Sequence, residues 1–221
     1  MKEIGFSEKI RIGAPELKVV QIEATVSNPA TSDSLWAEMT AEAERLRENF
    51  ELAELNKRPA IAGTRKAYKA LGKDPNRYRP SAEALGRRVI NGKGLYRLTA
   101  LIDIINLISL RSGYSIGGFD ADKIEGDTLV LDAGTKEDVF NAIGRGPLNI
   151  EGLPVYRDAI GGIGTPTSDE ERTKLTPGTT RLLMLVNMYE EEMTAEEVVA
   201  LTRNLLNRYA DLREFSWKTL K

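Results

Sequence analysis

Residues 98–140 of this 221-residue chain read LTALIDIINLISLRSGYSIGGFDADKIEGDTLVLDAGTKEDVF, and this stretch decides the fold class. Its first part carries apolar side chains at a helical spacing, at Leu98, Leu101, Ile102, Ile105, Leu107 and Ile108. Because apolar residues three and four apart share one helix face, we expect a mostly buried helix over about 97–111 that stops at Gly113. Strand-forming residues follow at 114–116 and 128–131. The stretch therefore predicts a helix that leads into a sheet.

Other helices and strands are predicted on both sides of this stretch. Upstream, helices are expected over about 33–56, 59–72 and 82–90, and strands over 10–12 and 17–26. Downstream, strands are expected over 153–156 and 181–188, and a short helix over 137–143. Thr194 and Glu197 have the spacing of a capping box, which begins a last helix that runs to about Phe215. Helices dominate the first half, strands the second, and no linker or repeat separates them. The sequence therefore predicts a single α+β domain over residues 1–221.

The composition excludes several kinds of catalysis. The chain is 41% hydrophobic and 29% charged, as is typical of a globular protein, and it contains neither Cys nor His. It therefore has no thiol nucleophile, no Ser-His-Asp triad and no imidazole or thiolate metal ligand. The carboxylates show no spacing that demands a metal, so we expect neither a metal nor a cofactor. Any catalysis must use carboxylates, hydroxyls, Lys, Arg, backbone amides or the substrate itself.

No segment of the sequence is long and apolar enough to predict a membrane span. The longest apolar stretch, at 101–110, is interrupted by Asp103 and Asn106 and falls well short of about 18 apolar residues. The first residues lack the apolar core of a signal peptide. We therefore expect a cytoplasmic protein without membrane contact.

The net charge of −2 hides a strongly basic segment. Residues 57–97 hold 12 Lys/Arg and 2 Asp/Glu, whereas residues 1–56 hold 6 Lys/Arg and 11 Asp/Glu. Phosphate backbones are bound mainly through such basic fields, and Tyr68 and Tyr78 can stack on unpaired bases. The alternative is that the long charged side chains only solvate two helices and that each Tyr is half-buried. We expect an RNA partner and no DNA partner. The residues expected to contact the RNA are Arg65, Lys66, Lys69, Lys73, Arg77, Arg79, Arg87 and Arg88.

The motifs of the central stretch resemble those of the B3/4 domain, the editing module of the bacterial phenylalanyl-tRNA synthetase β subunit. In that family, a helix with a Val-Asp-x-x-Asn run leads into Gly-x-Pro-Leu-His-Ala-Phe-Asp and then an Asp-x-x-Lys turn. Here Asp103 and Asn106 match the helix, SIGGFD at 115–120 matches the following turn, and Asp122 with Lys123 continues the agreement.

Fragments on either side extend the resemblance. RPSAEAL at 79–85, followed by two arginines, is similar to free-standing B3/4-domain proteins, which lack the rest of the synthetase. The glycine-rich 160–164 and the Thr-rich 173–180 resemble the synthetase's pocket loop and the segment after it. The resemblance is strong over about 58–140, weaker to 190 and thin at both ends.

The resemblance implies a B3/4-type α+β fold and a domain that binds aminoacyl-adenosine at the 3′ end of a tRNA. In the synthetase this domain hydrolyses tyrosine wrongly attached to the tRNA for phenylalanine, and a free-standing copy would act in trans. A separate editing site is needed because an apolar pocket discriminates between close analogues by a difference in binding free energy of only ~1–3 kcal/mol. The implied partner is therefore an aminoacyl-tRNA or its acceptor end, and the implied activity is deacylation of mischarged tRNA.

The chain departs from the family at Gly117, which stands where the family has His. Hydrolysis would then rest on a carboxylate or hydroxyl that orients water, or on the terminal ribose hydroxyl of the substrate. Positioning alone can contribute roughly 7–11 kcal/mol at best. The loss also favours an alternative, a non-catalytic module that binds a free amino acid or an RNA end. A third hypothesis is a structural or regulatory protein that uses the fold as an interaction surface.

Two groups of residues, besides the basic side chains, form the predicted site. Glu151 and Asp158 flank the expected strand at 153–156 and, with Thr165 in the glycine-rich loop, are the candidates for orienting water. The candidates for substrate binding are Asp103, Asn106, Gly117, Gly118, Phe119, Asp120, Gly161, Gly162 and Thr180. Structural alternatives remain: the acids cap turns or satisfy buried backbone groups, and the glycines form tight turns.

Overall fold

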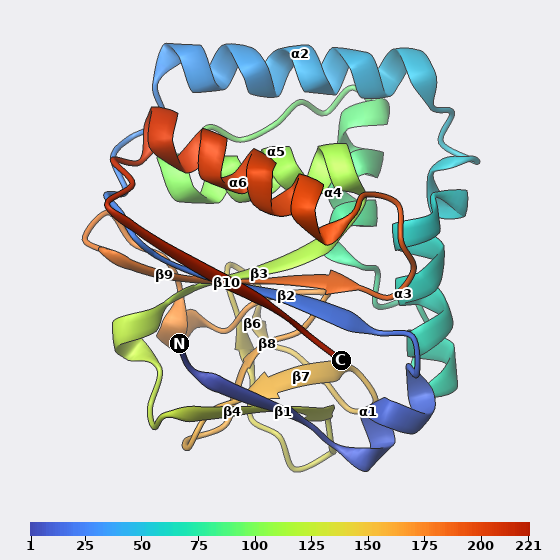
Figure 1. The fold of residues 1–221 in the computed structure, drawn as a ribbon. Coiled ribbons are helices and arrows are strands. Elements are labelled where there is room, and N and C mark those ends of the chain that lie inside the picture. The colour runs from blue at the N-terminus through green and yellow to red at the C-terminus, as the bar shows by residue number, and fades with distance from the viewer.

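Two four-stranded β-sheets and a layer of helices stack on one another in the computed structural model, which describes residues 1–221 (Figure 1). The central sheet is antiparallel and has the strand order β10–β2–β9–β3. Its strands are β2 (Lys18–Thr25), β3 (Ser115–Asp120), β9 (Arg181–Met188) and β10 (Glu214–Leu220). Because β2 comes early in the chain and β10 ends it, the central sheet ties the two ends of the sequence together.

The second sheet lies against the face of the central sheet that the helices leave free (Figure 1). Its order is β1–β4–β7–β8, with β1 parallel to β4 and the other pairs antiparallel. The strands are β1 (Glu3–Phe6), β4 (Thr128–Ala133), β7 (Pro154–Arg157) and β8 (Gly162–Gly164). A separate short pair is formed by β5 (Asn141–Ala142) and β6 (Gly146–Pro147).

Two long helices lie on the outer face of the central sheet, a third packs on the far side of one of them, and a fourth stands at one end of the layers (Figure 1). The helices on the sheet are α5 (Ala100–Ser112) and α6 (Ala195–Tyr209), and α2 (Asp33–Asn49) packs against α5. The helix at the end is α3 (Pro59–Ala70), and the remaining two are α1 (Glu8–Gly13) and α4 (Ser81–Ile90).

Strand β9 contributes to two hydrophobic cores because its apolar run is buried on both faces. Leu182, Met184 and Val186 join a cluster of 24 buried residues between the central sheet and the helices. Leu183 and Leu185 point the other way and join a cluster of 14 buried residues between the two sheets. A continuous apolar strand of this kind suits the middle layer of a three-layer structure.

The predicted α+β class is confirmed, together with most of the long elements. The helices expected at 59–72, 82–90 and 97–111 are α3, α4 and α5, and the strand expected at 181–188 is β9 with the same bounds. Gly113 ends α5 in the left-handed conformation, at a φ of 73°. None of the helices combines the length and the apolar composition needed to cross a bilayer.

Two local predictions are wrong. The strand expected at 10–12 is part of α1, whose N-cap Ser7 hydroxyl accepts a hydrogen bond from the Ile10 N–H at 3.3 Å. Ile10 is buried and Ile12 is exposed, so the two residues do not share a strand face. The helix expected at 137–143 does not form, because the Asp138 carboxylate binds the Thr135 N–H and pairs with Arg157.

Three elements differ from the prediction at the chain's ends and in α2. The last helix ends at Tyr209 rather than near Phe215, and the chain turns at Asp211 (φ 45°) before β10 pairs with β2. Helix α2 ends at Asn49 rather than about residue 56, and β1 has no counterpart among the predicted strands.

The capping box at the start of α6 gives a direct stability prediction. The Thr194 hydroxyl accepts from the Glu197 N–H at 3.3 Å, and the Glu197 carboxylate accepts from the Thr194 N–H at 2.8 Å. We expect Thr194→Ala to lower the free energy of unfolding by about 1 kcal/mol in urea titrations. Thr180→Ala, at an exposed position without a side-chain hydrogen bond, is the control and should change it by less than about 0.5 kcal/mol. Equal losses in both variants would contradict a role for the cap.

Candidate functional site

A cleft with a volume of about 860 Å³ lies where α4 and α5 meet β3 and the segment 165–175. Apolar side chains of α5, β3 and the following segment form part of its wall, namely Ile102, Ile105, Ile116 and Leu175. Such a volume accommodates a ligand of nucleoside or amino-acid size, and the apolar wall suits a side chain or a base.

The charged side chains that line the cleft are almost all basic. A single carboxylate, that of Asp169, accompanies six cationic side chains, namely Arg79, Arg87, Arg88, Lys93, Arg145 and Lys174. Arg145 and Lys93 make no side-chain hydrogen bond within the protein, so their charges are available to a ligand. The cleft therefore favours an anionic ligand.

The Asp169 carboxylate lies beside three glycines. Its Oδ2 accepts a hydrogen bond from the Gly118 N–H at 3.2 Å, and a Cβ atom at Gly164 would lie 2.6 Å from its Oδ1. Gly117 is the third neighbour, with its Cβ position 3.6 Å from the same oxygen. Burial raises the pKa of Asp169 to about 7, against the lowering effect of the Gly118 hydrogen bond. A carboxyl group with this pKa can exchange a proton near neutral pH.

Three of the residues predicted from the sequence to bind substrate or orient water line this cleft: Asn106, Gly118 and Thr165. The Asn106 amide makes no hydrogen bond within the protein and is free to meet a ligand. The Thr165 hydroxyl is already engaged, because it accepts from the Thr167 and Ser168 N–H groups and donates to the Ser168 carbonyl at 3.0 Å. Thr165 therefore shapes the turn beside Asp169.

Asp103 and Asp120 lie outside the cleft and hold neighbouring segments together. Asp103 is fully buried and accepts hydrogen bonds from the Thr31 hydroxyl and the Leu98 N–H, and burial raises its pKa. Asp120 accepts from the Thr179 hydroxyl at 2.8 Å and pairs with Lys123 at 3.3 Å. Asp120 matches the structural alternative of a buried polar group satisfied within the fold, whereas Asp103 is satisfied at Oδ2 and its buried Oδ1 has no partner.

The other predicted substrate residues are also away from the cleft. Gly117 and Phe119 point to the core between the sheets, where a Cβ at residue 117 would lie 2.7 Å from the Phe119 ring. A larger side chain at residue 117 would have to displace that ring. Gly161 and Gly162 lie at the start of β8, and Thr180 is exposed just before β9.

Glu151 and Asp158, the predicted water-orienting carboxylates, do not reach the cleft. Asp158 accepts two hydrogen bonds from Arg172, at 2.8 and 2.9 Å, and further ones from backbone N–H groups, including that of Gly161. Burial alone would raise the pKa of Asp158, but these bonds lower it below its usual value. Glu151 is half-exposed and lies 3.9 Å from the Lys136 ammonium. The acid that does line the cleft, Asp169, follows the glycine-rich loop by five residues, and that proximity is the only local signal for it.

The basic residues of 57–97 divide into separate groups. Arg79, Arg87 and Arg88 line the cleft, and Arg65 lies behind them on the buried Glu83. The remaining four lie elsewhere, namely Lys66, Lys69, Lys73 and Arg77.

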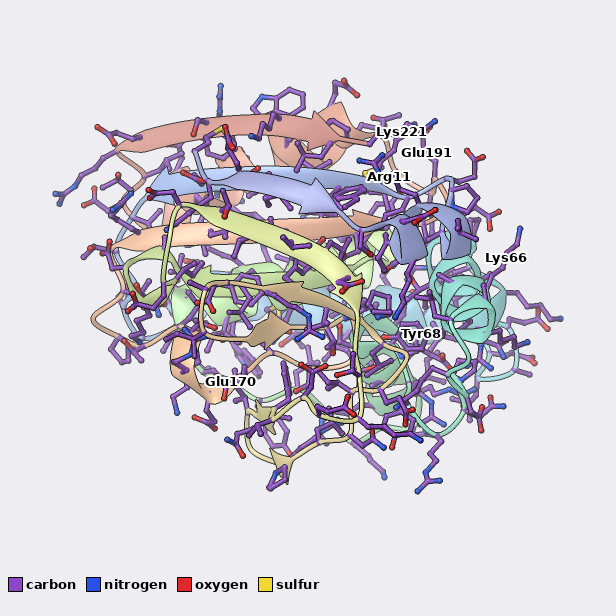
Figure 2. All side chains as sticks on the ribbon, turned by 90° about the horizontal axis from the view of Figure 1, so that it is seen from below. Arg11, Lys66, Tyr68, Glu170, Glu191 and Lys221 are labelled. Atoms are coloured by element: carbon purple, nitrogen blue, oxygen red, sulfur yellow. The ribbon has the colours of Figure 1, made fainter.

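Those four basic residues and the two tyrosines have different surroundings. Figure 2 shows Lys66 pointing outward from α3, and Lys69 is also exposed. The Lys73 ammonium is largely buried and donates to the Asn149 and Glu151 carbonyls at 3.0 and 2.6 Å. Tyr68 is fully buried and bonded to the Thr167 hydroxyl, so it is not available to stack on a base, whereas Tyr78 and Arg77 are near the surface.

Comparison with known proteins identifies the family. The family model of the B3/4 domain matches residues 63–209, and the chain belongs to that family. No curated protein matches the chain. A crystal structure of an N-terminal fragment of the phenylalanyl-tRNA synthetase β-subunit from Pyrococcus horikoshii is similar to it, at 14% identity and a TM-score of 0.46. That match covers 98% of this chain and 50% of the other, so this chain spans about half the length of that structure.

The raised pKa of Asp169 predicts how stability depends on pH. Between its ordinary value of 3.8 and about 7, the folded protein keeps a proton that the unfolded chain releases. This contribution is complete below about pH 4 and is lost as the pH rises through 7. Since Asn cannot ionise, the Tm of Asp169→Asn relative to the wild type should be higher at pH 8 than at pH 5. The expected increase in this difference is a few degrees, at about 2–4 °C per kcal/mol for this chain length.

The control is Glu137→Gln, because Glu137 is an exposed carboxylate whose side chain makes no hydrogen bond or ion pair within the protein. Its Tm difference from the wild type should stay constant between the two pH values. A constant difference for Asp169→Asn as well would mean that Asp169 titrates at an ordinary carboxyl pKa.

Proposed function

We propose that this protein binds the aminoacylated 3′ end of a tRNA in the cleft and hydrolyses the ester bond in trans. The observation that carries the proposal is the combination in one cleft of a basic rim, an apolar wall and a single carboxyl group of raised pKa. The basic rim suits the phosphates of the acceptor end, and the apolar wall suits the amino-acid side chain. Membership of the B3/4 family, whose domain edits tRNA in the synthetase, supports the same conclusion.

In the proposed reaction, Asp169 takes the role first assigned to Glu151 and Asp158. Its carboxylate accepts a proton from a water molecule as the water oxygen attacks the ester carbonyl carbon. The bond between that carbon and the ribose oxygen then breaks, and Asp169 returns the proton to the leaving ribose oxygen. The free Asn106 amide is placed to hold the aminoacyl group. A carboxyl group with a pKa near 7 suits both proton transfers.

A second candidate function is a binding module without turnover. The observation in its favour is that two of the donors next to Asp169 that could stabilise a tetrahedral intermediate are already occupied. The Gly118 N–H donates to Asp169, and the Thr165 hydroxyl is engaged in its own turn. No imidazole is present to replace them.

We also propose that residues 1–221 act as one domain and that the protein works in the cytoplasm, where charged tRNA is used. The pairing of β2 and β10, which lie outside the matched residues 63–209, with the rest of the central sheet supports the first point.

A panel of charged tRNAs, beginning with tyrosine on the tRNA for phenylalanine, tests the proposed activity. We expect loss of the ester bond above background, and a decrease of about 100-fold or more in the rate for Asp169→Asn, as for loss of a general base. Glu151→Gln, which changes a carboxylate outside the cleft, is the control and should keep the wild-type rate. Charged tRNA that binds without losing its ester would favour the binding module instead.

The RNA-binding surface is tested by paired charge reversals. Lys93→Glu with Arg145→Glu changes two unpaired rim charges, and Lys66→Glu with Lys69→Glu changes two exposed charges away from the cleft. We expect the first pair to weaken tRNA binding and to reduce the slope of log K against log salt by about 2. The second pair should leave the slope unchanged. The opposite outcome would place the RNA on the outer face of α3.

A further inference from the structure

One wall of the cleft is organised by a buried carboxylate that faces three guanidinium groups. Glu83, in α4, has no exposed surface. Its Oε2 lies 2.8 Å from Arg65 Nη1, and its Oε1 lies 2.9 Å from Arg87 Nε and 3.5 Å from Arg79 Nε. One negative charge therefore faces three positive charges, and two of these belong to side chains that line the cleft.

Arg65 has a structural role, because its guanidinium group connects several segments of the chain. Besides Glu83, it donates to the Pro75 carbonyl at 3.3 Å and to Asn76 Oδ1 at 2.6 Å, so it fastens α3 to the turn before α4. Arg65, Arg79 and Arg87 share the single carboxylate of Glu83 as counter-ion, so three positive charges and one negative charge leave this cluster with a net charge of +2. Two like charges held close together repel each other, and an anion in the cleft would relieve this repulsion.

The hydrogen-bonding groups of these arginines are incompletely used. Arg79 makes no hydrogen bond, and its Nε is buried without an acceptor. Arg87 donates only through Nε, which leaves both terminal nitrogens free. Next to them, the Arg88 guanidinium lies 4.1 Å from the centre of the Tyr96 ring, and its Nε is also buried without an acceptor. The terminal nitrogens of Arg79 and Arg87 make no hydrogen bond within the protein, so they are available to acceptor atoms of a ligand.

We propose that Arg79 and Arg87, held by Glu83, form a phosphate subsite that binds the phosphate group of a nucleotide. A phosphate presents several acceptor oxygens and matches the planar fork of a guanidinium, so it can serve both arginines at once. Tyr96, which is 63% exposed and lines the same cleft, offers its ring to the base of that nucleotide. The inference rests on the proposed function in that it identifies where the phosphate of the acceptor-end nucleotide lies.

Calorimetric titration of the full-length protein with adenosine 5′-monophosphate and with adenosine tests the subsite. We expect the monophosphate to bind at least about 10-fold more tightly than the nucleoside, and inorganic phosphate to compete with it. Arg79→Gln and Arg87→Gln should each weaken monophosphate binding about 10-fold or more and leave adenosine binding unchanged. Arg79→Lys, which keeps the charge and loses the fork, should fall between them and the wild type.

Arg77→Gln is the matched control, because Arg77 is exposed, belongs to the same basic segment and does not line the cleft. It should bind the monophosphate as the wild type does, and the Tm of each variant checks that the chain is folded. Equal affinities for monophosphate and nucleoside, or wild-type affinity in both cleft variants, would overturn the subsite. The subsite would also be overturned if the wild-type protein did not bind the monophosphate. The same holds if Arg79→Gln and Arg87→Gln lost affinity only for a free amino acid and kept their affinity for the monophosphate.

The outcome is separable from that of the proposed function. If the monophosphate binds as expected while no charged tRNA is hydrolysed, the subsite stands and the proposed activity fails. If Arg79→Gln and Arg87→Gln hydrolyse charged tRNA at the wild-type rate and bind the monophosphate normally, the activity stands and the subsite fails.

Discussion

Burial of β9 on both faces is the constraint on which the rest of the structure depends. Its even-numbered side chains, such as Met184, pack against the helices, and its odd-numbered ones, such as Leu185, pack against the second sheet. Each fully buried aliphatic side chain stabilises the fold by roughly 1.5–3 kcal/mol, so this strand leaves little room for unpaired polar groups. The one amide on it, Asn187, is satisfied by the Tyr156 hydroxyl and the Ser115 carbonyl. The polar groups that are free to meet a ligand therefore lie beside the edge strand β3, where the cleft is.

The two glycines of β3 have different consequences on its two faces. On the helix side, a Cβ at Gly118 would lie 2.4 Å from Ile105 Cδ1, so the bare backbone keeps the cleft open beside α5. On the other side, the Phe119 ring and the Asp169 carboxylate occupy the space beside Gly117 and Gly164. Substitution at residue 117 alone would disturb the core before it changed the chemistry.

The sequence predicts those elements whose signals are local. Strand β9 and helices α3, α4 and α5 carry complete patterns and clear end signals such as Gly113, and they are found where expected. Residues 10–12 have two Ile spaced like strand residues, and only the Ser7 cap and the burial of Ile10 show that they form a helix. Strand β10 follows an apolar helical face without a break in pattern, and its pairing with β2 spans nearly the whole chain, so no local signal marks it.

The site follows the same division between local and long-range information. The basic segment is visible in the sequence, but which of its arginines face the cleft depends on Glu83, whose burial holds Arg65 behind the wall. Arg145 and Lys174 lie in an acidic part of the sequence and reach the rim only through the fold. The pKa of Asp169 is likewise raised because the fold buries its carboxyl group beside β3 and β8. Strand β3 is distant from Asp169 in the sequence, so the sequence around Asp169 gives no sign of this burial.

The basic lining and the carboxyl group of the cleft act on each other through the charge of the ligand. Burial raises the pKa of Asp169 to about 7. A bound phosphate adds negative charge, and negative charge nearby favours the protonated form of a carboxyl group. Because this interaction weakens with distance, a phosphate held by Arg79 and Arg87 disturbs Asp169 less than a phosphate bound directly beside it. The surplus of guanidinium groups around Glu83 thus draws the anion to one wall of the cleft and favours a carboxyl group that still exchanges a proton near neutral pH.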